Sequence, residues 1–463
     1  MDLVISLDGS GEKSVRVYRA LRAAIEDGRL PAGHRLPASR VFAAELGVAR
    51  GSVAAAYERL VAEGYLTARV GRGTFVAPVR TGSRPRRASG DPLRPRAGWD
   101  LRPLPVSSDE AKPRYDFRTG IPDAQLFPFD TWRRLVAAEV RLRANSPGTY
   151  ADPAGQPALR AAIARYLGVS RSIGVTPADV LVTNGTQQAL DLIARVLVRP
   201  GDVVAVEEPG YPPARRLFGS LGARVAGVPV DEEGLVVGAL PDRARLVYAT
   251  PSHQFPLGRP MSLARRHALI DWARRRPAAI VEDDYDSEFR FSSRPLEPLY
   301  ALGPERVLYV GTFSKTMLPT VRTGFVLVPP SLREALVAAR QVTDGFGPAA
   351  VQAALARFIE DGELARHVRR ATRSYAVRHA AIVARLSDMS QLNVVPSAAG
   401  LHVTAFLADG DSAPVVAAAA RAGVAVDDLG IYSETRTPGF VFGFGAVDPA
   451  LIDEGLHRFR MVL

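Results

Sequence analysis

The sequence predicts a multidomain protein: a small domain of helices and a hairpin, a basic linker, and a large α/β domain with a mostly parallel sheet. Its 463 residues exceed the size of one ordinary domain. Apolar residues recur at helical spacing near the N-terminus, whereas strand and helix patterns alternate after residue 114. Residues 79–114 are rich in Arg, Pro, Gly and Ser and lack periodic apolar residues, which is typical of a tether.

The composition excludes several classes of protein. Cysteine is absent, so the chain has no disulfide, no thiolate metal site and no thiol nucleophile. It has no run of about 18 apolar residues and no leader-like N-terminus, so we expect a soluble cytoplasmic protein. The net charge of +11 is concentrated in residues 1–114, which hold 20 Lys or Arg against 12 Asp or Glu. This distribution favours a polyanionic partner, above all nucleic acid.

Residues 14–78, which follow a short N-terminal arm (1–13), are predicted to form a winged helix-turn-helix domain. Val17, Leu21 and Ile25 lie at helical spacing, and Gly28 ends that helix. The other predicted elements are helices over 38–46 and 50–63 and strands over 65–67 and 74–76. Three helices followed by a hairpin is the element order of a winged helix.

The third predicted helix carries candidate DNA contacts. It opens with Arg50-Gly51-Ser52, and a recognition helix reaches base edges and phosphates with its N-terminal residues. Arg50 can fork onto guanine, whereas Ser52 suits a phosphate oxygen. Arg40 on the preceding helix and Arg72 at the tip of the hairpin would hold the DNA backbone. Each arginine alone is typical of a solvated surface, and their succession favours DNA binding.

Residues 115–463 alternate between strand and helix patterns. The predicted elements include strands over 180–183, 203–206, 246–249, 279–281 and 307–310 and a helix over 187–198. Such alternation predicts a mostly parallel sheet with ligands beyond the carboxyl ends of its strands. We expect a large subdomain over about 150–330 and a small one from 115–149 and 331–463.

One lysine stands out among the 59 Lys and Arg residues, of which only Lys13, Lys112 and Lys315 are lysine. Arginine stays charged and cannot act as a nucleophile, whereas a lysine in a partly desolvated site can attack a carbonyl. Lys315 follows the predicted strand 307–310. It is therefore a candidate for binding an aldehyde cofactor, the alternative being an ordinary surface lysine.

A run of carboxylates follows the predicted strand 279–281. A carboxylate there can keep a pyridine nitrogen protonated, which makes the ring an electron sink. Strand alternation places Asp283 and Tyr285 on one side and Asp284 on the other. Asp283 is therefore predicted at the ring nitrogen and Tyr285 at the phenolic oxygen. Asp284 is the alternative if the strand has already ended, and Glu282 with both aspartates as a metal site is another.

Further residues complete a predicted site for pyridoxal 5'-phosphate. Thr186 and Gln187 lie at a predicted helix start, where free amide hydrogens and the dipole attract a phosphate. Arg322 would add a permanent charge for the same anion, beside hydroxyls suited to it. These hydroxyls belong to Thr312 and Ser314. Tyr211 either stacks on the pyridine ring or packs in a turn.

The N-terminal motifs resemble those of the GntR family of bacterial repressors. The matching stretches are Gly28 to Gly33, Leu36 to Arg40, Leu46 to Val53 and Gly71 to Val76. The resemblance implies that Arg40, Arg50, Ser52 and the wing glycine Gly71 contact double-stranded operator DNA. Ala54 departs from the relatives that carry another arginine at that position.

The rest of the chain resembles fold-type I aminotransferases and, more specifically, the MocR subfamily of GntR regulators. The matching stretches are Gly120 to Asp123, Tyr150 to Gly155, Thr250 to Pro256, Glu282 to Phe289 and Gly311 to Lys315. The resemblance implies an aldimine between pyridoxal phosphate and Lys315. It also implies a domain-swapped homodimer, in which the head of one subunit packs on the body of the other.

Two positions depart from the aminotransferase pattern. Phe255 stands where an asparagine usually lies beside the ring oxygen, and His253 or Gln254 would have to substitute for it. Val441 aligns with the arginine that holds a substrate carboxylate, and Arg436 is the nearest candidate. Without that fork an α-amino acid loses its orienting pair.

We therefore expect a transcription regulator that responds to pyridoxal phosphate, an amine or an amino acid. The alternatives are a working aminotransferase with an accessory DNA-binding head, and a dimerisation scaffold without a cofactor.

Overall fold

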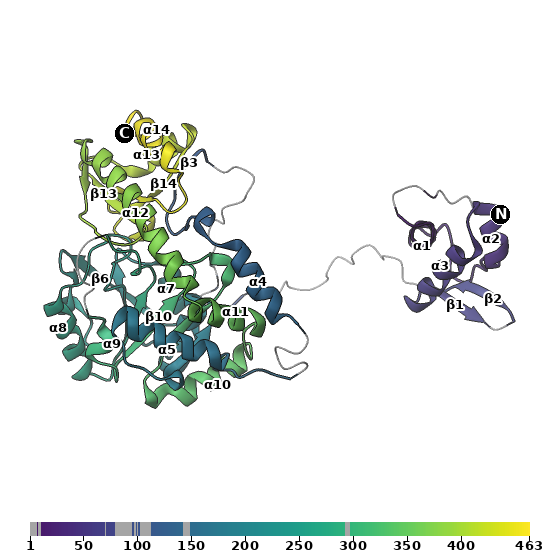
Figure 1. The fold of residues 1–463 in the computed structure, drawn as a ribbon, viewed down its shortest axis with the longest axis horizontal. Helices are drawn as coiled ribbons and strands as arrows, with labels where there is room; N and C mark the ends of the chain where they lie inside the picture. The colour runs from purple at the N-terminus through teal and green to yellow at the C-terminus, as the bar shows by residue number, and fades with distance from the viewer. Residues whose placement is uncertain are drawn as a thin grey trace. The chain divides into compact units, whose positions relative to one another are not determined.

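The chain forms two compact units, Met1–Arg94 and Pro95–Leu463. The computed structural model describes residue 7 and residues 11–69, 71–78, 95–96, 99, 101, 113–141, 149–291 and 297–463. Most of the predicted N-terminal arm and linker, including Lys112, lies outside the described residues. Figure 1 labels the helices and strands of each unit. Among the described helices, none combines the length and apolar composition that a membrane crossing requires.

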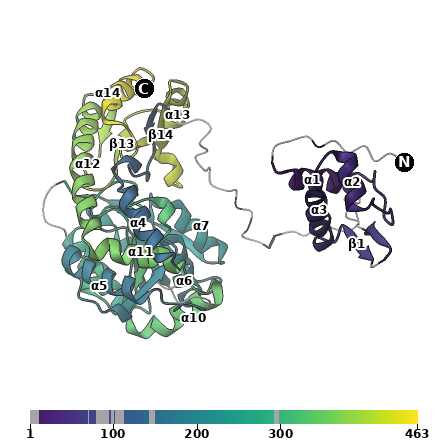
Figure 2. The ribbon, with the colours of Figure 1, turned by 45° about the vertical axis from the view of Figure 1, so that its right-hand side comes forward.

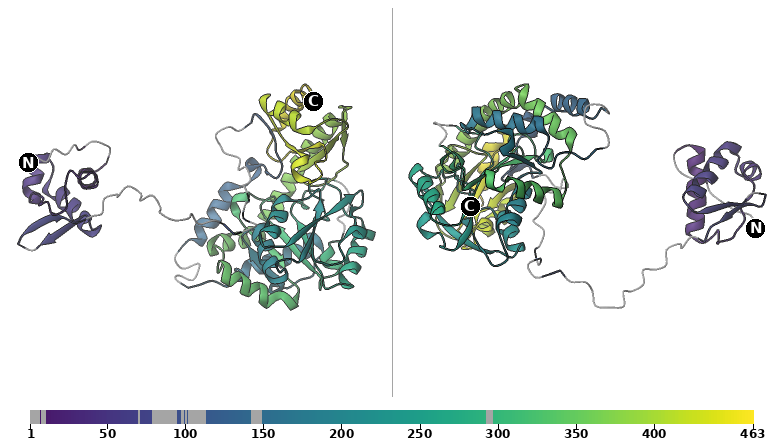
Figure 3. Two further views of the ribbon diagram at one scale, coloured as in Figure 1. Left: turned by 180° about the vertical axis from the view of Figure 1, so that it is seen from behind. Right: turned by 90° about the horizontal axis from the view of Figure 1, so that it is seen from below.

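The first unit has the predicted winged helix-turn-helix architecture. It contains α1 (Lys13–Glu26), α2 (Ser39–Leu46), α3 (Arg50–Ala62) and the antiparallel strands β1 (Leu66–Arg69) and β2 (Gly73–Val76). Leu21, Phe42 and Leu60, one from each helix, are fully buried in one shared core. Both strands extend further into the hairpin than predicted, and Figure 3 shows this hairpin beside the helices.

The second unit is built on an eight-stranded sheet in the order β4-β11-β10-β9-β8-β5-β6-β7. Its strands are β4 (Val180–Thr183), β5 (Val203–Glu208), β6 (Arg224–Asp231), β7 (Gly234–Leu235), β8 (Ala244–Ala249), β9 (Ala279–Asp284), β10 (Val307–Thr312) and β11 (Gly324–Leu327). Neighbours from β10 across to β6 pair in parallel, and β11 is antiparallel to both β10 and β4. The prediction of a mostly parallel sheet is confirmed.

Helices cover both faces of this sheet, which explains why most residues of its central strands β8, β9 and β10 are buried. One core contains residues of α5 (Pro157–Arg171), α8 (Leu263–Arg274) and α11 (Ala349–Glu360). The other contains residues of α6 (Thr186–Leu197), α7 (Pro212–Ser220) and α10 (Arg333–Thr343). Successive strand residues alternate between the cores: Val182 joins the first and Leu181 the second.

A second, five-stranded sheet has the order β12-β13-β15-β14-β3. Its strands are β3 (Tyr115–Phe117), β12 (Leu392–Val394), β13 (His402–Leu407), β14 (Val424–Asp428) and β15 (Gly439–Gly443). They pack with α12 (Glu363–Ser387), α13 (Ser412–Arg421) and α14 (Ile452–Arg460). Helix α12 is 25 residues long and contributes Leu364 to the core of the large sheet and Ile382 to that of the small one. Its course is visible in Figure 2.

The packing of three helices bears on the subdomain limits expected from the sequence. Helices α4 (Phe129–Glu139), α10 and α11 lie in the ranges assigned to the small subdomain. Their buried residues, among them Leu135, Leu336 and Leu355, nevertheless belong to the two cores that flank the large sheet. The short helix α9 (Leu299–Leu302) packs there as well.

Candidate cofactor site and DNA-binding surface

Lys315 lies just beyond the carboxyl end of β10, where the parallel sheet predicts a ligand site. Its Nζ donates a hydrogen bond of 2.7 Å to the carbonyl oxygen of Gly120, in the segment that follows β3. A Cβ at Gly120 would lie 2.7 Å from this Nζ, and its φ of +76° also favours glycine. Burial lowers the pKa of Lys315, although Asp286 and Asp283 oppose that shift. A lysine with a lowered pKa is more readily available as a nucleophile.

Asp283, on β9, is close enough to this amine for the two groups to interact electrostatically. The strand continues through Asp284, so side-chain alternation holds across both aspartates. Tyr248 on β8 donates a hydrogen bond of 2.7 Å to Asp283 Oδ2. The other oxygen, Oδ1, is buried and has no partner among the described residues. Burial raises the pKa of Asp283 to about 7, and the positive charge of Lys315 is among the groups that oppose the shift.

Asp284 faces the opposite way and is already ion-paired. Its Oδ2 accepts hydrogen bonds from Arg171, at the end of α5, and from Tyr309 on β10, and the charged pair is almost fully buried. Glu282 accepts hydrogen bonds from the backbone nitrogens of Leu299 and Tyr300 at 3.0 and 2.9 Å. The three acids therefore have separate partners and do not converge on one point, and Asp283 alone of the three neighbours Lys315.

Tyr285 is joined to a buried group of side chains that the sequence did not predict. Its hydroxyl donates to the backbone oxygen of His253 at 3.0 Å and lies 3.1 Å from His253 Nδ1. That nitrogen also lies 3.1 Å from both carboxylate oxygens of Asp286, while Nε2 lies 3.1 Å from Ser397 Oγ. His253, not Gln254, is therefore the residue beside Tyr285.

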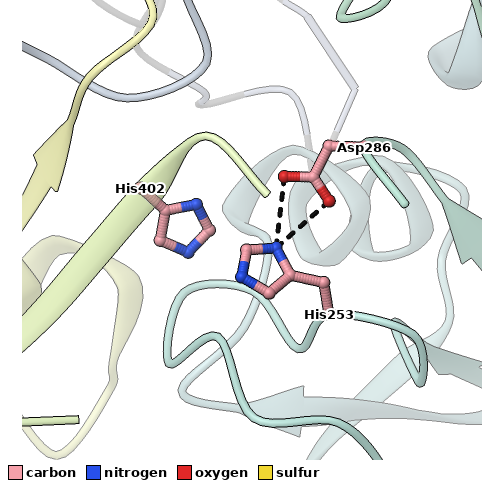
Figure 4. A group of neighbouring side chains, drawn as sticks. All are labelled: His253, Asp286 and His402. Atoms are coloured by element: carbon pink, nitrogen blue, oxygen red, sulfur yellow. Dashed lines mark hydrogen bonds and ion pairs between the residues drawn. The ribbon is translucent and has the colours of Figure 1, made fainter. Parts of the chain in front are cut away.

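Figure 4 shows His253 between Asp286 and His402. One possible ligand atom from each of these residues lies within 4.8 Å of the others, a separation that would suit a metal ion. Both ring nitrogens of His253 already have protein partners, and His402 Nε2 bonds the Pro256 carbonyl at 2.9 Å. Burial lowers the pKa of His402 to about 3, so this ring is neutral. We interpret the group as a hydrogen-bonded link between Tyr285 and the segment before β13.

The predicted phosphate-binding residues gather where α6 begins. Thr186 is the first residue of α6, and the exposed Arg322 donates a hydrogen bond of 2.9 Å to the carbonyl oxygen of Asn184. Thr312 Oγ1 and Ser314 Oγ lie 3.1 Å apart at the end of β10. A Cβ at Gly324 would lie 2.8 Å from the Gly311 oxygen, on β10, and 3.0 Å from Gly185 Cα. This glycine lets the start of α6 approach the end of β10.

Tyr211 and Phe255 form part of an aromatic group near the same site. Their ring centroids are 5.8 Å apart with the planes at 89°, and Phe255 also lies edge-on to Tyr285. Burial raises the pKa of Tyr211, and the amide of Gln187 is close enough to oppose that shift. Gln187 Nε2 is itself buried without a hydrogen-bond partner among the described residues. Gln254 instead directs its amide to the carbonyls of Pro209 and Phe255, at 2.9 and 2.6 Å.

The position aligned with the carboxylate-binding arginine and the nearest arginine to it lie in different surroundings. Val441 is fully buried on β15 and packs with Leu257 and Leu429. Arg436 is exposed between Tyr432 and β15, with a left-handed φ of +51°.

The predicted DNA-contacting residues of the first unit lie on its surface. Arg50 is the first residue of α3, Arg40 lies on α2, and Gly71 and Arg72 lie in the hairpin turn; all four are exposed, and Ser52 is half-buried. Within the described part of the chain, the side chains of Arg40, Arg50 and Arg72 form no ion pair. By contrast, Arg22 and Arg59 pair with Glu26 and Glu63 at 2.8 and 2.9 Å.

A winged helix-turn-helix unit and a body with this double-sheet fold define a class of transcription regulator. Residues 13–76 match the model of bacterial regulatory proteins of the gntR family. Residues 123–455 match the model of aminotransferase class I and II. The same body is found in α-aminoadipate aminotransferase LysN from Thermus thermophilus, solved in complex with N-(5'-phosphopyridoxyl)-L-leucine. That structure has a TM-score of 0.70 and 29% identity, over 76% of this chain and 92% of the other.

Relatives with both halves identify the family more closely. The chain is 38% identical to a probable rhizopine catabolism regulatory protein, MocR, of Rhizobium meliloti, over 99% of this chain and 95% of the relative. It is 34% identical to the pyridoxine biosynthesis regulator PdxR of Corynebacterium glutamicum, over 96% and 95%. The chain therefore belongs to the MocR-type regulators of the GntR family, as its motifs predicted. It is a DNA-binding regulator with an aminotransferase-like body.

Proposed function

We propose that this regulator binds pyridoxal 5'-phosphate at Lys315 and that the bound cofactor, or its reaction with an amine or amino acid, changes its affinity for DNA. The observation that carries the proposal is Asp283 Oδ1, which is buried without a partner among the described residues, in a carboxyl group that interacts with the Lys315 amine. Leaving such an oxygen without a donor costs about 1–3 kcal/mol. The protonated nitrogen of a pyridine ring would provide that donor.

The remaining residues fit the other parts of this cofactor. Bound pyridoxal phosphate supplies an aldehyde carbon that forms a carbon–nitrogen double bond with a primary amine. Lys315 provides the resident amine, Asp283 holds the ring nitrogen, Tyr285 the phenolic oxygen, and Tyr211 covers the ring. The phosphate is held by Thr186, Gln187, Thr312, Ser314 and Arg322, where the amides of α6 point outward.

The DNA-binding surface is assigned on a different observation. Arg40, Arg50 and Arg72 are exposed and free of described carboxylates, so their charges are available to phosphates and base edges. Ser52 and the backbone at Gly71 complete the surface that would contact an operator. Two heads in a homodimer would read two half-sites, and an exchange of heads between subunits would link each to the other body. As a DNA-binding regulator, the protein would act in the cytoplasm.

Ligand binding can change DNA affinity only if the ligand binds two conformations of the regulator with different affinities. The link from Tyr285 through His253 to Ser397 connects the cofactor site with the segment between β12 and β13. These hydrogen bonds would transmit a change at the cofactor site to the small sheet. Transamination is expected to be absent or slow, since a buried Val441 replaces the cation of an enzyme.

The proposal is tested by fluorescence anisotropy on a labelled DNA fragment from upstream of the protein's own gene. Cofactor-free protein is titrated with pyridoxal phosphate, and Lys315→Ala is measured in parallel. We expect the wild-type affinity to change at least severalfold at saturating cofactor and the variant to be unresponsive. Equal affinity without cofactor, with cofactor, and with cofactor plus an amine or amino acid, in a protein that demonstrably binds the cofactor, would contradict the proposed regulation.

A further inference from the structure

The wall next to the Lys315 amine presents a carboxylate. Lys315 Nζ bonds the Gly120 carbonyl, and the preceding residue, Thr119, donates both its backbone nitrogen and its hydroxyl to Asp427 Oδ2, at 3.0 and 2.7 Å. Asp427 lies on β14 of the small sheet. It is linked through Thr119 to Gly120, whose carbonyl oxygen accepts the hydrogen bond from the Lys315 amine. Its half-buried position keeps it close to solvent.

Asp427 is held in place by a tyrosine that also borders the aromatic group. Tyr432 donates a hydrogen bond of 2.9 Å to the same oxygen, Oδ2, and its ring lies 5.0 Å from that of Phe255. All three donors thus converge on Oδ2. Asp427 Oδ1 accepts no hydrogen bond from any described residue, and it remains available to a ligand.

The cation of this wall is already engaged. Arg118 forks onto Asp116 with hydrogen bonds of 2.8 and 2.6 Å, and Asp427 is among the charges that raise the pKa of its guanidinium. Arg322 lies at the start of α6, at the phosphate end of the site. Directly across the strand from Asp427, Val441 is buried in an apolar cluster.

Asp286 and Asp283 both act on Lys315. Burial raises the pKa of Asp283 and of its neighbour Glu207 to about 7, so the charge that a ligand meets here comes chiefly from Asp286 and Asp427. An α-carboxylate placed here would meet Asp427 as a like charge, which is unfavourable in a partly desolvated site. An ammonium or a hydroxyl would instead supply the hydrogen that Oδ1 lacks.

We infer that the effector is a primary amine without an α-carboxylate, that it carries a second ammonium or hydroxyl group, and that Asp427 binds this second group. Diamines, amino alcohols and amino sugars have this chemistry. The inference rests on the proposed function, because the primary amine is the group that would react at the cofactor. It goes further by naming the class of effector and the residue that selects it.

The test compares α-amino acids with the amines that remain after removal of their carboxylate. Protein loaded with pyridoxal phosphate is titrated with L-ornithine and putrescine, with L-serine and ethanolamine, and with L-alanine and ethylamine. The half-saturating concentration is read from the change in the cofactor's absorbance band. We expect putrescine and ethanolamine to bind roughly tenfold or more tightly than their amino acids and than ethylamine, as one charge-assisted hydrogen bond predicts.

A matched pair of variants locates the selecting group. Asp427→Asn removes the charge, whereas Asp428→Asn removes an equal charge from the next residue of β14, which bonds Ser412 and Gly430 instead. We expect Asp427→Asn to weaken the binding of putrescine by roughly tenfold and to leave the binding of ethylamine unchanged. Asp428→Asn should not weaken the binding of putrescine in this way. The wild-type titrations stand even if a variant fails to fold.

Three results would overturn the inference. Amino acids that bind as tightly as their decarboxylated partners, in a protein with a normal cofactor band, would remove the effector class and leave the proposed function standing. An unchanged preference for putrescine in Asp427→Asn would remove the assignment to Asp427. If the wild-type protein showed no cofactor band at all, the proposed function and the inference would both fall.

Discussion

The two units of this regulator handle charge in opposite ways. In the winged head, Arg40, Arg50 and Arg72 lie exposed without a described ion pair. In the body, by contrast, a charged pair such as Arg171 with Asp284 is almost fully buried. Near Lys315, Asp283 Oδ1 is buried without a partner among the described residues. The difference indicates that the head is suited to a long polyanion and the body to one small, enclosed ligand. Separate mutations should therefore impair DNA binding and cofactor binding independently.

The largest expected effect is a loss of cofactor attachment in the body that leaves DNA binding by the head unchanged. Lys315→Ala should abolish covalent attachment of pyridoxal phosphate, because among the described residues only Lys315 places an amine near Asp283. Absorbance spectroscopy should show loss of the cofactor band. Non-specific DNA binding at low salt should be unchanged, since the arginines of the head are untouched. A variant that kept the band would show that the amine lies elsewhere.

The next effect concerns two neighbouring carboxylates of β9. Asp284→Asn should destabilise the body by about 3–5 kcal/mol, because it leaves Arg171 buried without its charged partner. Asp283→Asn should cost far less stability, because burial already disfavours the charge of Asp283. It should instead weaken cofactor binding. Chemical denaturation and cofactor titration of both variants would check this, and equal losses of stability would contradict the pairing described for Asp284.

The head is tested by Arg50→Ala. Losing one arginine that forks onto a base should weaken specific DNA binding by about 1–3 kcal/mol and leave the cofactor band unchanged. Arg59→Ala is a suitable control, because Arg59 is already paired with Glu63 on the same helix. Gel-shift titrations at one fixed salt concentration would measure both. Similar losses in the two variants would show that the contact surface lies elsewhere on the head.

The stability of the cofactor-free body is expected to depend on pH. Burial raises the pKa of Asp283 and of Glu207 to about 7, from ordinary values near 4. Because their folded-state pKa values are raised, the stability they contribute is complete below the unfolded pKa and is lost as the pH rises towards 7. Each pH unit in that window should cost about 1.4 kcal/mol for one such group. Calorimetry from pH 5 to 7 should show this decline, and Asp283→Asn should reduce its slope; an unchanged slope would contradict the assignment.

Local patterns in the sequence predicted most of the elements and named the residues of the candidate site, because those signals are local. The apolar run 279–281 and the rule of alternation placed Asp283 and Asp284 on opposite sides, and β9 does extend far enough for that rule to apply. The helix start at Thr186 and the strand before Lys315 were equally visible. Turn residues and periodicity were sufficient for the winged head.

The partners of these residues could not be predicted in the same way. Gly120 is separated from Lys315 by 195 residues and Arg171 from Asp284 by 113, and no local pattern announces either pair. Tyr248 lay within a predicted strand, yet nothing showed that its hydroxyl would reach Asp283. His253 was considered for the ring oxygen, but its bonds to Asp286 and Ser397 depend on how the two sheets pack. These contacts are set by tertiary structure.

Chemical labelling at Lys315 tests the central claim most directly. Purified protein is incubated with pyridoxal phosphate, reduced with borohydride, digested, and its peptides are mapped by mass spectrometry. Lys13, exposed in the head, serves as the internal control. We predict a phosphopyridoxyl group on Lys315 at close to one per chain and little on Lys13. Labelling of Lys13 and Lys315 to the same low extent would contradict a built cofactor site.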